Sequence, residues 1–373
     1  MFGRGTALCA RAAAALAAVR SHERLVITRY ATISRDETLE LERGGVGVGV
    51  RNGGRADAGP LFRGCGGGQA TLIVTPQKQS LLVDAGWPGF ENRDAKRIVA
   101  AAQKAGVKQI DFMMMTHYHR DHAGGVEQLA GLIPIRTFVD HGPNTETGKA
   151  AEDLSESWKR AMAAHNSKHM VLKPGEKIPL RGAEVTVVTA RGAQLAKPLK
   201  GGGQPNPLCP TAAQRQPDPT ENARSLGIAV DFGKFRFIDL GDLTWNKEIE
   251  LVCPNNRIGK VDVYLTTHHG MDTSGPATIV HALAPRVAIM NNGARKGGAA
   301  PAWQVIRNSP GLEDLWQVHF AVAAGAENNT EEAKIANMEE KCAGYGLKVS
   351  AKKDGSFSVT NERNGNTKTY AAR

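Results

Sequence analysis

The chain of 373 residues is long enough for one large domain or two small ones, and it can bury a sizeable core without disulfides. Its hydrophobic share of 41% and its charged share of 23% exclude a disordered chain, a collagen-like chain and a coiled coil. Because the sequence contains no run of about 18 apolar residues, it predicts no membrane span.

The formal net charge of +10 is spread along the chain and is not concentrated in a basic run. Such a charge is compatible with a nucleic acid or an anionic surface as a partner, but a solvated basic surface is the favoured interpretation. Charge alone therefore leaves nucleic-acid binding open. The sequence does not decide the oligomeric state.

Five cysteines occur, and none of them forms a CxxC pair, so the sequence does not predict a cysteine zinc site. Cys209 and Cys253 each stand beside a proline in a loop-like stretch. An oxidising compartment would allow these two to pair, and the sequence alone leaves the pairing open. The localisation stays open between secreted or periplasmic and cytoplasmic.

Residues 1–66 form an atypical N-terminal segment. The first 70 residues hold ten arginines and no lysine, and the first lysine is Lys78. Apolar residues here show no sustained helical or strand period. Residues 25–33 are consistent with one strand for which no partner is evident. The segment is interpreted as disordered, as signal-like, or as the product of a wrong start or shifted reading frame.

Residues 67–325 are regular and predict one α/β domain, to which residues 326–373 add a helix and a β-hairpin. Residues 191–221 form a Gly/Pro-rich loop, which is long enough to be functional or mobile. The predicted strands are 70–75, 79–84, 109–116, 135–140, 185–189, 225–232, 234–242, 261–267 and 287–292. The predicted helices are 92–105, 123–131, 147–166, 276–284 and 329–344, and the terminal hairpin turns at Asp354-Gly355.

The strongest chemical signal directly follows the apolar strand 109–116. His117, His119, Asp121 and His122 fall within six residues, and imidazole and carboxylate are suitable ligands for zinc and similar divalent metals. The spacing suits two adjacent metal ions, with His117 and His119 on one and Asp121 and His122 on the other. A polar loop with chance histidines is the alternative, but four ligand-type residues in so short a stretch make it improbable.

Three further strand ends carry polar residues. Asp242 follows the strand 234–240 and is placed to bridge two cations, with a turn aspartate as the alternative. His268 and His269 follow the strand 261–267; we expect one of them to close the second metal site, with a slight preference for His268. Asp84 ends the strand 79–84, and its expected role is to orient a ligand or the histidine loop.

These residues, in this order, resemble the metallo-β-lactamase-fold hydrolase superfamily over residues 68–310. The stretches ENARSLGIAVDFGKFRFIDLGD (221–242) and VYLTTHHG (263–270) are closer still to the hydrolase domain of ComEC, the channel protein of competence (DNA uptake). Without a membrane span, this chain is similar to a stand-alone soluble or secreted relative. The resemblance implies a four-layer αββα sandwich.

The resemblance also implies how metals are shared. One metal lies on His117 and His119 together with a mid-domain histidine, the second lies on Asp121, His122 and the late histidine, and Asp242 bridges. This sequence departs from that pattern because it has no histidine between His169 and His268. The candidates for that place are Thr189, Asn222 and Ser225. One or two Zn²⁺ ions are expected, with Mn²⁺ or Fe²⁺ as alternatives.

The implied chemistry is metal-assisted hydrolysis, in which a divalent ion lowers the pKa of bound water from about 15.7 to about 7 and so supplies hydroxide. Asp121 is expected to help hold that nucleophile as a catalytic residue. His141 and Asn291 are candidates for contacting substrate. The favoured substrate is a phosphodiester or related ester; a lactone, thioester or β-lactam is the alternative. A metal-binding protein without turnover is a second class.

Overall fold

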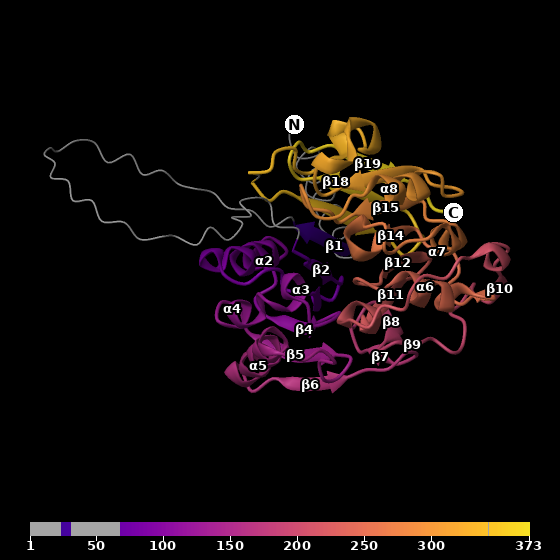
Figure 1. Cartoon of the computed structure of the whole chain (residues 1–373). Helices are drawn as coiled ribbons and strands as arrows, with labels where there is room; N and C mark the ends of the chain where they lie inside the picture. Colours follow the sequence, from indigo (N-terminus) through magenta and orange to yellow (C-terminus); the bar gives the residue numbers. More distant parts are fainter. Residues whose placement is uncertain (1–23, 31–67, 342) are drawn as a thin grey trace, which may run out of the picture.

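Two β-sheets pack face to face, and helices cover the outer side of each sheet (Figure 1). The computed structural model describes residues 24–30, 68–341 and 343–373. Among the described residues, nine strands form one sheet and eight form the other, with a small two-stranded ribbon at the side. The predicted α/β class is confirmed.

The first sheet combines an antiparallel half with a parallel half. Its order is β19-β18-β17-β1-β2-β3-β4-β5-β6, and the strands from β3 to β6 run parallel. The bounds are β1 (Leu25–Tyr30), β2 (Thr71–Val74), β3 (Ser80–Val83), β4 (Ile110–Met114), β5 (Ile135–Asp140), β6 (Lys168–Val171), β17 (Gly346–Ala351), β18 (Phe357–Asn361) and β19 (Thr367–Tyr370).

The second sheet has the order β16-β15-β14-β12-β11-β8-β7, and β9 pairs with β8. The strands β12, β14, β15 and β16 run parallel. The bounds are β7 (Lys177–Ile178), β8 (Glu184–Ala190), β9 (Ala193–Gln194), β11 (Gly227–Phe232), β12 (Phe235–Asp239), β14 (Val263–Leu265), β15 (Val287–Met290) and β16 (Asp314–Gln317). The ribbon pairs β10 (Gln204–Pro205) with β13 (Asn255–Asn256).

The helices divide between the two outer faces. Those covering the first sheet are α2 (Arg93–Lys104), α3 (Arg120–Ala123), α4 (Val126–Ala130) and α5 (Lys149–Ala164). Those covering the second sheet are α6 (Trp245–Val252), α7 (Ala277–Leu283) and α8 (Ala300–Arg307). Short 3₁₀ turns lie at Phe90–Asn92, Cys209–Thr211, Glu221–Arg224, Thr267–Gly270, Val322–Ala324, Ala326–Asn328 and Glu332–Lys334.

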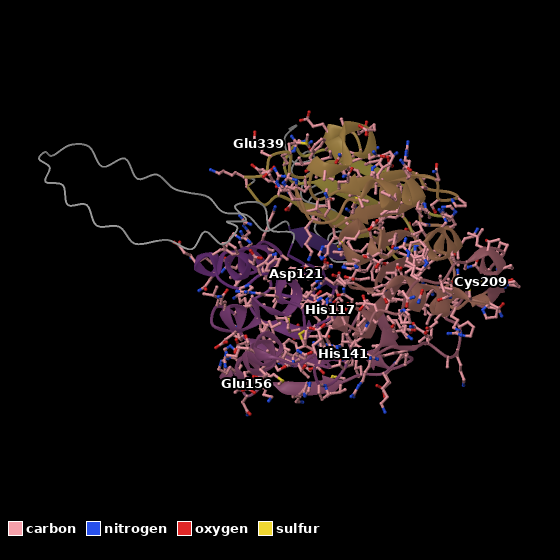
Figure 2. All side chains as sticks on the ribbon, viewed as in Figure 1. His117, Asp121, His141, Glu156, Cys209 and Glu339 are labelled. Atoms are coloured by element: carbon pink, nitrogen blue, oxygen red, sulfur yellow. A yellow bond between two sulfur atoms is a disulfide. The ribbon has the colours of Figure 1, made fainter. Side chains whose placement is uncertain are left out.

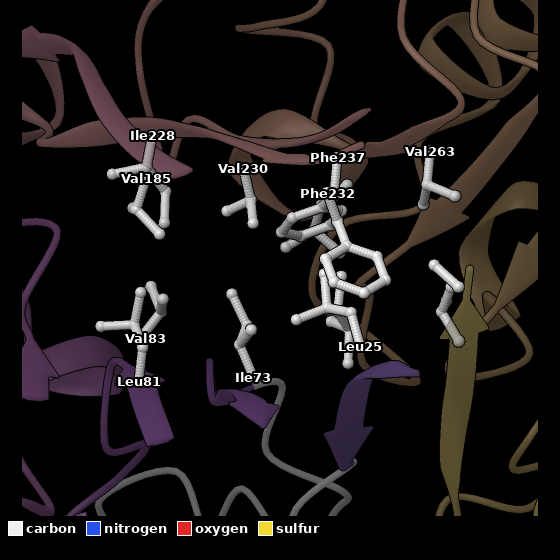
Figure 3. Close-up of a cluster of buried hydrophobic side chains, with 14 of the residues drawn as sticks. Leu25, Ile73, Leu81, Val83, Val185, Ile228, Val230, Phe232, Phe237 and Val263 are labelled. Atoms are coloured by element: carbon white, nitrogen blue, oxygen red, sulfur yellow. The ribbon is translucent and has the colours of Figure 1, made fainter. Parts of the chain in front are cut away.

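Three apolar clusters hold these layers together. The largest lies between the sheets, where Ile73 and Leu81 of the first sheet face Val230 and Phe237 of the second (Figure 3). The other two fill the space between each sheet and its helices. Strands therefore bury both faces, which is why their sequences are nearly continuous apolar runs. The arrangement is the predicted αββα order of layers.

A disulfide joins Cys209 to Cys253, a pairing that the sequence alone left open. It ties the long loop 191–221 to the end of α6, and Cys209 lies at the edge of the molecule (Figure 2). The bond closes a loop with a sequence separation of 44 residues, which restricts the unfolded chain. Disulfides persist mainly in oxidising compartments.

The strand at 25–33 does have partners, contrary to the prediction. β1 pairs antiparallel with β17 on one side and with β2 on the other. Leu25 and Ile27 are buried in the cluster between the sheets. The partner β17 is more than 300 residues away in sequence, so no local pattern could show the pairing. The remainder of residues 1–66 lies outside the described residues.

The helix predicted at 329–344 is wrong. The segment makes only a short 3₁₀ turn and then runs extended beside β16, where Ile335 forms a parallel bridge with Gln317. The side chain of Asn337 donates to the carbonyl oxygens of Val318 and Tyr345. These tertiary hydrogen bonds cover the open edge of the sheet and outweigh the helical propensity of the segment. The predicted hairpin after it is confirmed.

In the part of the chain that the structure describes, no helix is both long and apolar enough to cross a membrane.

Leu25→Ala tests whether β1 belongs to the fold. The substitution leaves a cavity in the cluster between the sheets, so the free energy of unfolding should fall by about 2–5 kcal/mol. Leu132→Ala is the matched control, because Leu132 is 44% exposed and should cost about 0.5 kcal/mol or less. Urea denaturation measures both. Equal, small losses would show that residue 25 lies outside the core.

Candidate metal centre

The candidate metal centre lies where the carboxyl ends of parallel strands from both sheets meet. Asp84 follows β3, and the motif that begins at His117 follows β4, the parallel neighbour of β3. Asp242 follows β12, and His268 follows β14, which is parallel to β12. Parallel strands place their carboxyl ends at one edge, so four stretches far apart in sequence converge there. His117 and Asp121 lie near the middle of the molecule (Figure 2).

Four buried side chains form the tightest group. One ligand atom from each of Asp121, His122, Asp242 and His269 lies within 4.8 Å of the others. His269 Nε2 is 3.1 Å from Asp121 Oδ2, and His122 Nε2 is 3.1 Å from the same oxygen. The structure therefore places His269 in the cluster, whereas the sequence slightly preferred His268.

The carboxylate of Asp242 is the centre of this group. Its Oδ2 atom is 3.2 Å from His122 Nε2 and 3.5 Å from His269 Nε2. The same atom is 3.6 Å from His268 Nε2 and 4.0 Å from His117 Nε2. One carboxylate oxygen thus lies near four imidazole nitrogens, which is the geometry expected of a bridging position.

Hydrogen bonds on the far side of the rings fix their orientation. His122 Nδ1 donates to Asp84 Oδ2 at 2.7 Å, and Asp84 also accepts from the backbone N–H of Thr116 at 2.8 Å. His269 Nδ1 donates to the backbone carbonyl oxygen of Asn291 at 3.1 Å. In both rings, a donor at Nδ1 leaves the Nε2 lone pair directed into the cluster when the ring is neutral. Asp84 thus lies behind the His122 ring, on the side away from the cluster.

The backbone is strained at the residues that present these groups. Asp84 has φ of 60°, His268 has 52° and His269 has 56°, all in the left-handed region that side chains with a Cβ rarely adopt. Gly241 has φ of 58°, and a Cβ there would lie 2.8 Å from Thr116 Cβ. Surrounding packing must impose such conformations, and strained residues of this kind gather at functional sites.

Burial and charge act against each other in the cluster. Burial would raise the pKa of Asp121 and Asp242, but the neighbouring His122 holds both well below their usual range. Burial would lower the pKa of His122, but Asp242, Asp121 and Asp84 raise it well above its usual range. Burial lowers the pKa of His117 well below its usual range, with His122 adding to the effect. The carboxylates therefore stay ionised, and His117 stays neutral with a free lone pair.

The donor set fits a divalent cation. His117 Nε2 and Asp242 Oδ1 are buried, and no hydrogen-bond partner is found for either among the described residues. Buried polar atoms without partners are costly unless an ion or water satisfies them. Imidazole and carboxylate donors in one buried cluster suit zinc, iron or manganese.

The pair expected to hold the first metal is only half enclosed. The ring centroids of His117 and His119 are 4.6 Å apart. His119 Nε2 lies 3.1 Å from Glu146 Oε1, a carboxylate that the sequence gave no reason to select because it stands in an irregular loop. The side chains of His119 and Glu146 are 28% and 32% exposed. Neither residue belongs to the tight group of four.

A segment after the long loop lies against the motif. The backbone N–H of Tyr118 donates to Glu221 Oε2, and the backbone N–H of Leu226 donates to the carbonyl oxygen of Thr116. These two contacts place residues 222–225 beside His117. Asn222 Oδ1 and Ser225 Oγ are buried there without a hydrogen-bond partner among the described residues. Both residues were candidates to replace the missing mid-domain histidine. The third candidate, Thr189, also has a buried Oγ1 without a hydrogen-bond partner among the described residues.

The two residues expected to contact substrate are engaged within the protein. His141 is 2% exposed, and its Nε2 lies 3.0 Å from Glu221 Oε2. Asn291 is also 2% exposed; its Nδ2 donates to Gln69 and its Oδ1 accepts from Thr266. A role of either side chain in contacting substrate is therefore not supported. The backbone carbonyl oxygen of Asn291 instead accepts a hydrogen bond from His269 Nδ1, a contact that the sequence did not indicate.

The fold and the cluster define an α/β protein with a candidate metal centre between two sheets. Residues 63–186 match the model of the metallo-beta-lactamase superfamily, a stretch that includes Asp84 and the motif from His117 to His122. The match covers less than half of the chain, and the chain has the metallo-beta-lactamase fold. No curated protein sequence matches the chain.

Some solved structures of other proteins are similar to parts of the chain. A metallo-β-lactamase with a HARLDQ motif from Cronobacter sakazakii is 16% identical, with 47% of this chain and 56% of that chain covered and a TM-score of 0.29. CmlA, a diiron β-hydroxylase from Streptomyces venezuelae, is 16% identical, with coverage of 59% and 42% and a TM-score of 0.32. The chain therefore spans roughly half the length of these proteins. Likenesses this low assign no activity.

Asp84→Asn tests the orienting role. The amide cannot accept the His122 proton with the strength of a carboxylate, so metal affinity should fall by about 10–100-fold although no ligand is removed. Asp153→Asn, in an exposed ion pair with Lys149, should leave the affinity unchanged. Competition with a chromogenic chelator measures both. Equal affinities in the two variants would remove Asp84 from the site.

Glu248, which lies close to the histidine loop, makes the free energy of unfolding depend on pH. Burial raises its pKa to about 8, although the backbone N–H of Gly275 donates to its Oε2 at 2.6 Å. The folded state then binds this proton more tightly than the unfolded state, whose pKa is near 4.5. Stability should fall as pH rises between those two values and stay level above them.

Glu248→Gln should remove this dependence. We expect the variant to melt higher than the wild type at pH 9 and to match it at about pH 4, where both forms are neutral. Thermal unfolding followed by circular dichroism across this range gives the comparison. A difference in melting temperature that is the same at every pH would show that Glu248 does not titrate in this range.

Proposed function

We propose that the chain is a metal-dependent hydrolase that acts on a phosphodiester or a related ester. The observation that carries the proposal is the position of Asp242 Oδ2, within 4.0 Å of the Nε2 atoms of four histidines. A lone structural aspartate would need one such partner, not four. The superfamily fold supports the same conclusion.

His122, His269, Asp121 and Asp242 would hold one ion, and His117 with His119 would contribute to a second. The chemistry supplied there would be Lewis acidity, which lowers the pKa of water to about 7. The chain's own part is to fix the ligands from behind and to exclude bulk water. Asp121 is 6% exposed, so it reaches the margin of the cluster and can accept a hydrogen bond from the attacking water.

The first metal position would take oxygen donors in place of the absent histidine. Asn222 Oδ1 and Ser225 Oγ supply buried, unpartnered oxygens beside His117. Oxygen donors suit Mn²⁺ or Fe²⁺ better than a purely nitrogen set does, whereas zinc suits the histidine-rich position. We propose one or two ions, with Zn²⁺ at the position of His122 and His269.

The preference for a phosphodiester rests on the resemblance to the ComEC hydrolase domain. The residues that carry it are Ser225-Leu226, Gly241-Asp242 and His268-His269-Gly270. The net charge of +10 agrees with an anionic substrate such as a nucleic acid. A lactone, thioester or β-lactam fits the same chemistry and forms the comparison class in the assay.

A metal-binding protein without turnover is the second candidate. The observation that favours it is the incomplete first position, which lacks a histidine between His169 and His268. A single ion held by the group of four would then satisfy the buried charges without a second ion to polarise the substrate.

The two candidates separate in one experiment. Untagged protein is loaded with zinc or manganese, its metal content is measured by mass spectrometry, and it is assayed with bis-p-nitrophenyl phosphate and nitrocefin. We expect diester hydrolysis that falls at least about a thousandfold in Asp121→Ala and His117→Ala. Asp153→Ala, on an exposed helix face, should retain full activity. Stoichiometric metal with no hydrolysis of any ester would contradict the hydrolase.

A further inference from the structure

Lys296 reaches into the candidate metal centre from a loop that follows β15. Its ammonium group contacts Asp121 Oδ2, one of the four clustered ligand groups. The ammonium also lies 5.7 Å from the centre of the Trp87 ring. The Lys296 side chain is 31% exposed, so it connects the buried cluster to solvent.

Backbone contacts fix the place from which this side chain extends. The N–H of Gly298 donates to the carbonyl oxygen of His269 at 2.9 Å, and the N–H of Gly293 donates to the carbonyl oxygen of Lys296 at 2.8 Å. Gly297 has φ of 73°, and a Cβ there would lie 2.1 Å from the His269 carbonyl oxygen. The loop is therefore built against the ligand loop, and only the lysine stem is free to turn.

Asp121 Oδ2 cannot contact the Lys296 ammonium and a divalent cation at the same time. In this structure the ammonium satisfies the carboxylate oxygen that also faces His122 and His269. A metal ion in the cluster would take that oxygen and repel the ammonium at contact distance in a site of low dielectric. The stem is long and partly exposed, so the ammonium can turn from Asp121 toward the solvent margin without leaving the site.

We propose that Lys296 binds the anionic group of the substrate beside the metal centre, and that it sets a preference for phosphate esters over uncharged esters. The proposal rests on the proposed function, since it needs an occupied metal centre. An ammonium beside a metal ion offers a phosphate oxygen a charge-assisted hydrogen bond, while the metal takes another oxygen. An uncharged ester gains nothing comparable from the lysine.

The neighbouring residue supplies a matched control. Arg295 lies on the same loop, is 66% exposed and pairs with Glu340 at 2.5 Å, away from the cluster. Lys296→Met keeps the length of the stem and removes the charge. Arg295→Met makes the same chemical change one residue earlier.

Metal binding is measured first, because it distinguishes a ligand-binding lysine from a merely structural one. Lys296→Met should bind Zn²⁺ at least as tightly as the wild type, since a cation that competes for Asp121 is removed. A loss of zinc affinity in Lys296→Met, with Arg295→Met unchanged, would make the lysine a structural support and overturn the proposal. If the wild type itself takes up no metal, the proposed function fails, and the role of Lys296 fails with it.

Inorganic phosphate is then titrated calorimetrically into the zinc-loaded proteins. The wild type and Arg295→Met should bind it equally, and Lys296→Met about 10–100-fold more weakly, as expected for a lost charge-assisted hydrogen bond. In assays, KM for bis-p-nitrophenyl phosphate should rise by a similar factor, while KM for uncharged p-nitrophenyl acetate stays the same. Zinc-loaded wild type that binds no phosphate, or Lys296→Met that binds it normally, would overturn the role of Lys296 and leave the metal centre standing.

Discussion

The meeting of parallel strand ends from two different sheets is the constraint on which the site depends. The first sheet delivers Asp84 and the histidine motif, and the second delivers Asp242 and His269. Neither sheet alone brings Asp121, His122, Asp242 and His269 together. The apolar cluster between the sheets therefore does more than stabilise the fold, because its thickness sets the separation of the two halves of the metal centre.

Bringing these groups together is electrostatically costly. Asp84, Asp121 and Asp242 are buried carboxylates within one network, and burial without compensation is strongly unfavourable. His122 compensates part of this charge. Burial acts to lower its pKa, but the three carboxylates raise it. Lys296 adds a second positive charge at Asp121. A divalent cation would compensate the charge of the carboxylates more completely than His122 and Lys296 do. The cluster is therefore more consistent with a metal-binding site than with a purely structural network.

The sequence predicted what depends on local pattern. The motif from His117 to His122, the strand before it and the aspartate after β12 were predicted because apolar runs ended in ligand-type residues. The same local logic could not choose between His268 and His269, since that choice depends on two successive left-handed residues. The sequence could not show Glu146 or Lys296, which stand in irregular loops and reach the site only through tertiary packing.

The predictions that failed share one physical cause. β1 was expected to have no partner, and residues 329–344 were expected to be helical, yet β1 lies along β17 and Ile335 lies beside Gln317 of β16. Edge pairing of this kind depends on unsatisfied backbone groups that another part of the chain exposes. His141 illustrates the same dependence on tertiary contacts. It follows a strand end as the candidate ligands do, but its Nε2 lies 3.0 Å from Glu221 Oε2, a residue distant in sequence.

The position of β5 shows why strand ends are not equivalent within one sheet. β3 and β4 stand between the antiparallel half and β5, and the motif after β4 reaches the second sheet, where Asp242 Oδ2 lies 3.2 Å from His122 Nε2. The segment 221–226 contacts the end of β4 through Leu226 and Thr116, and its Glu221 also reaches His141 after β5. The two imidazoles therefore differ in their own partners: His122 faces two carboxylates of the cluster, whereas Glu221 holds His141, although both follow buried parallel strands of the same sheet.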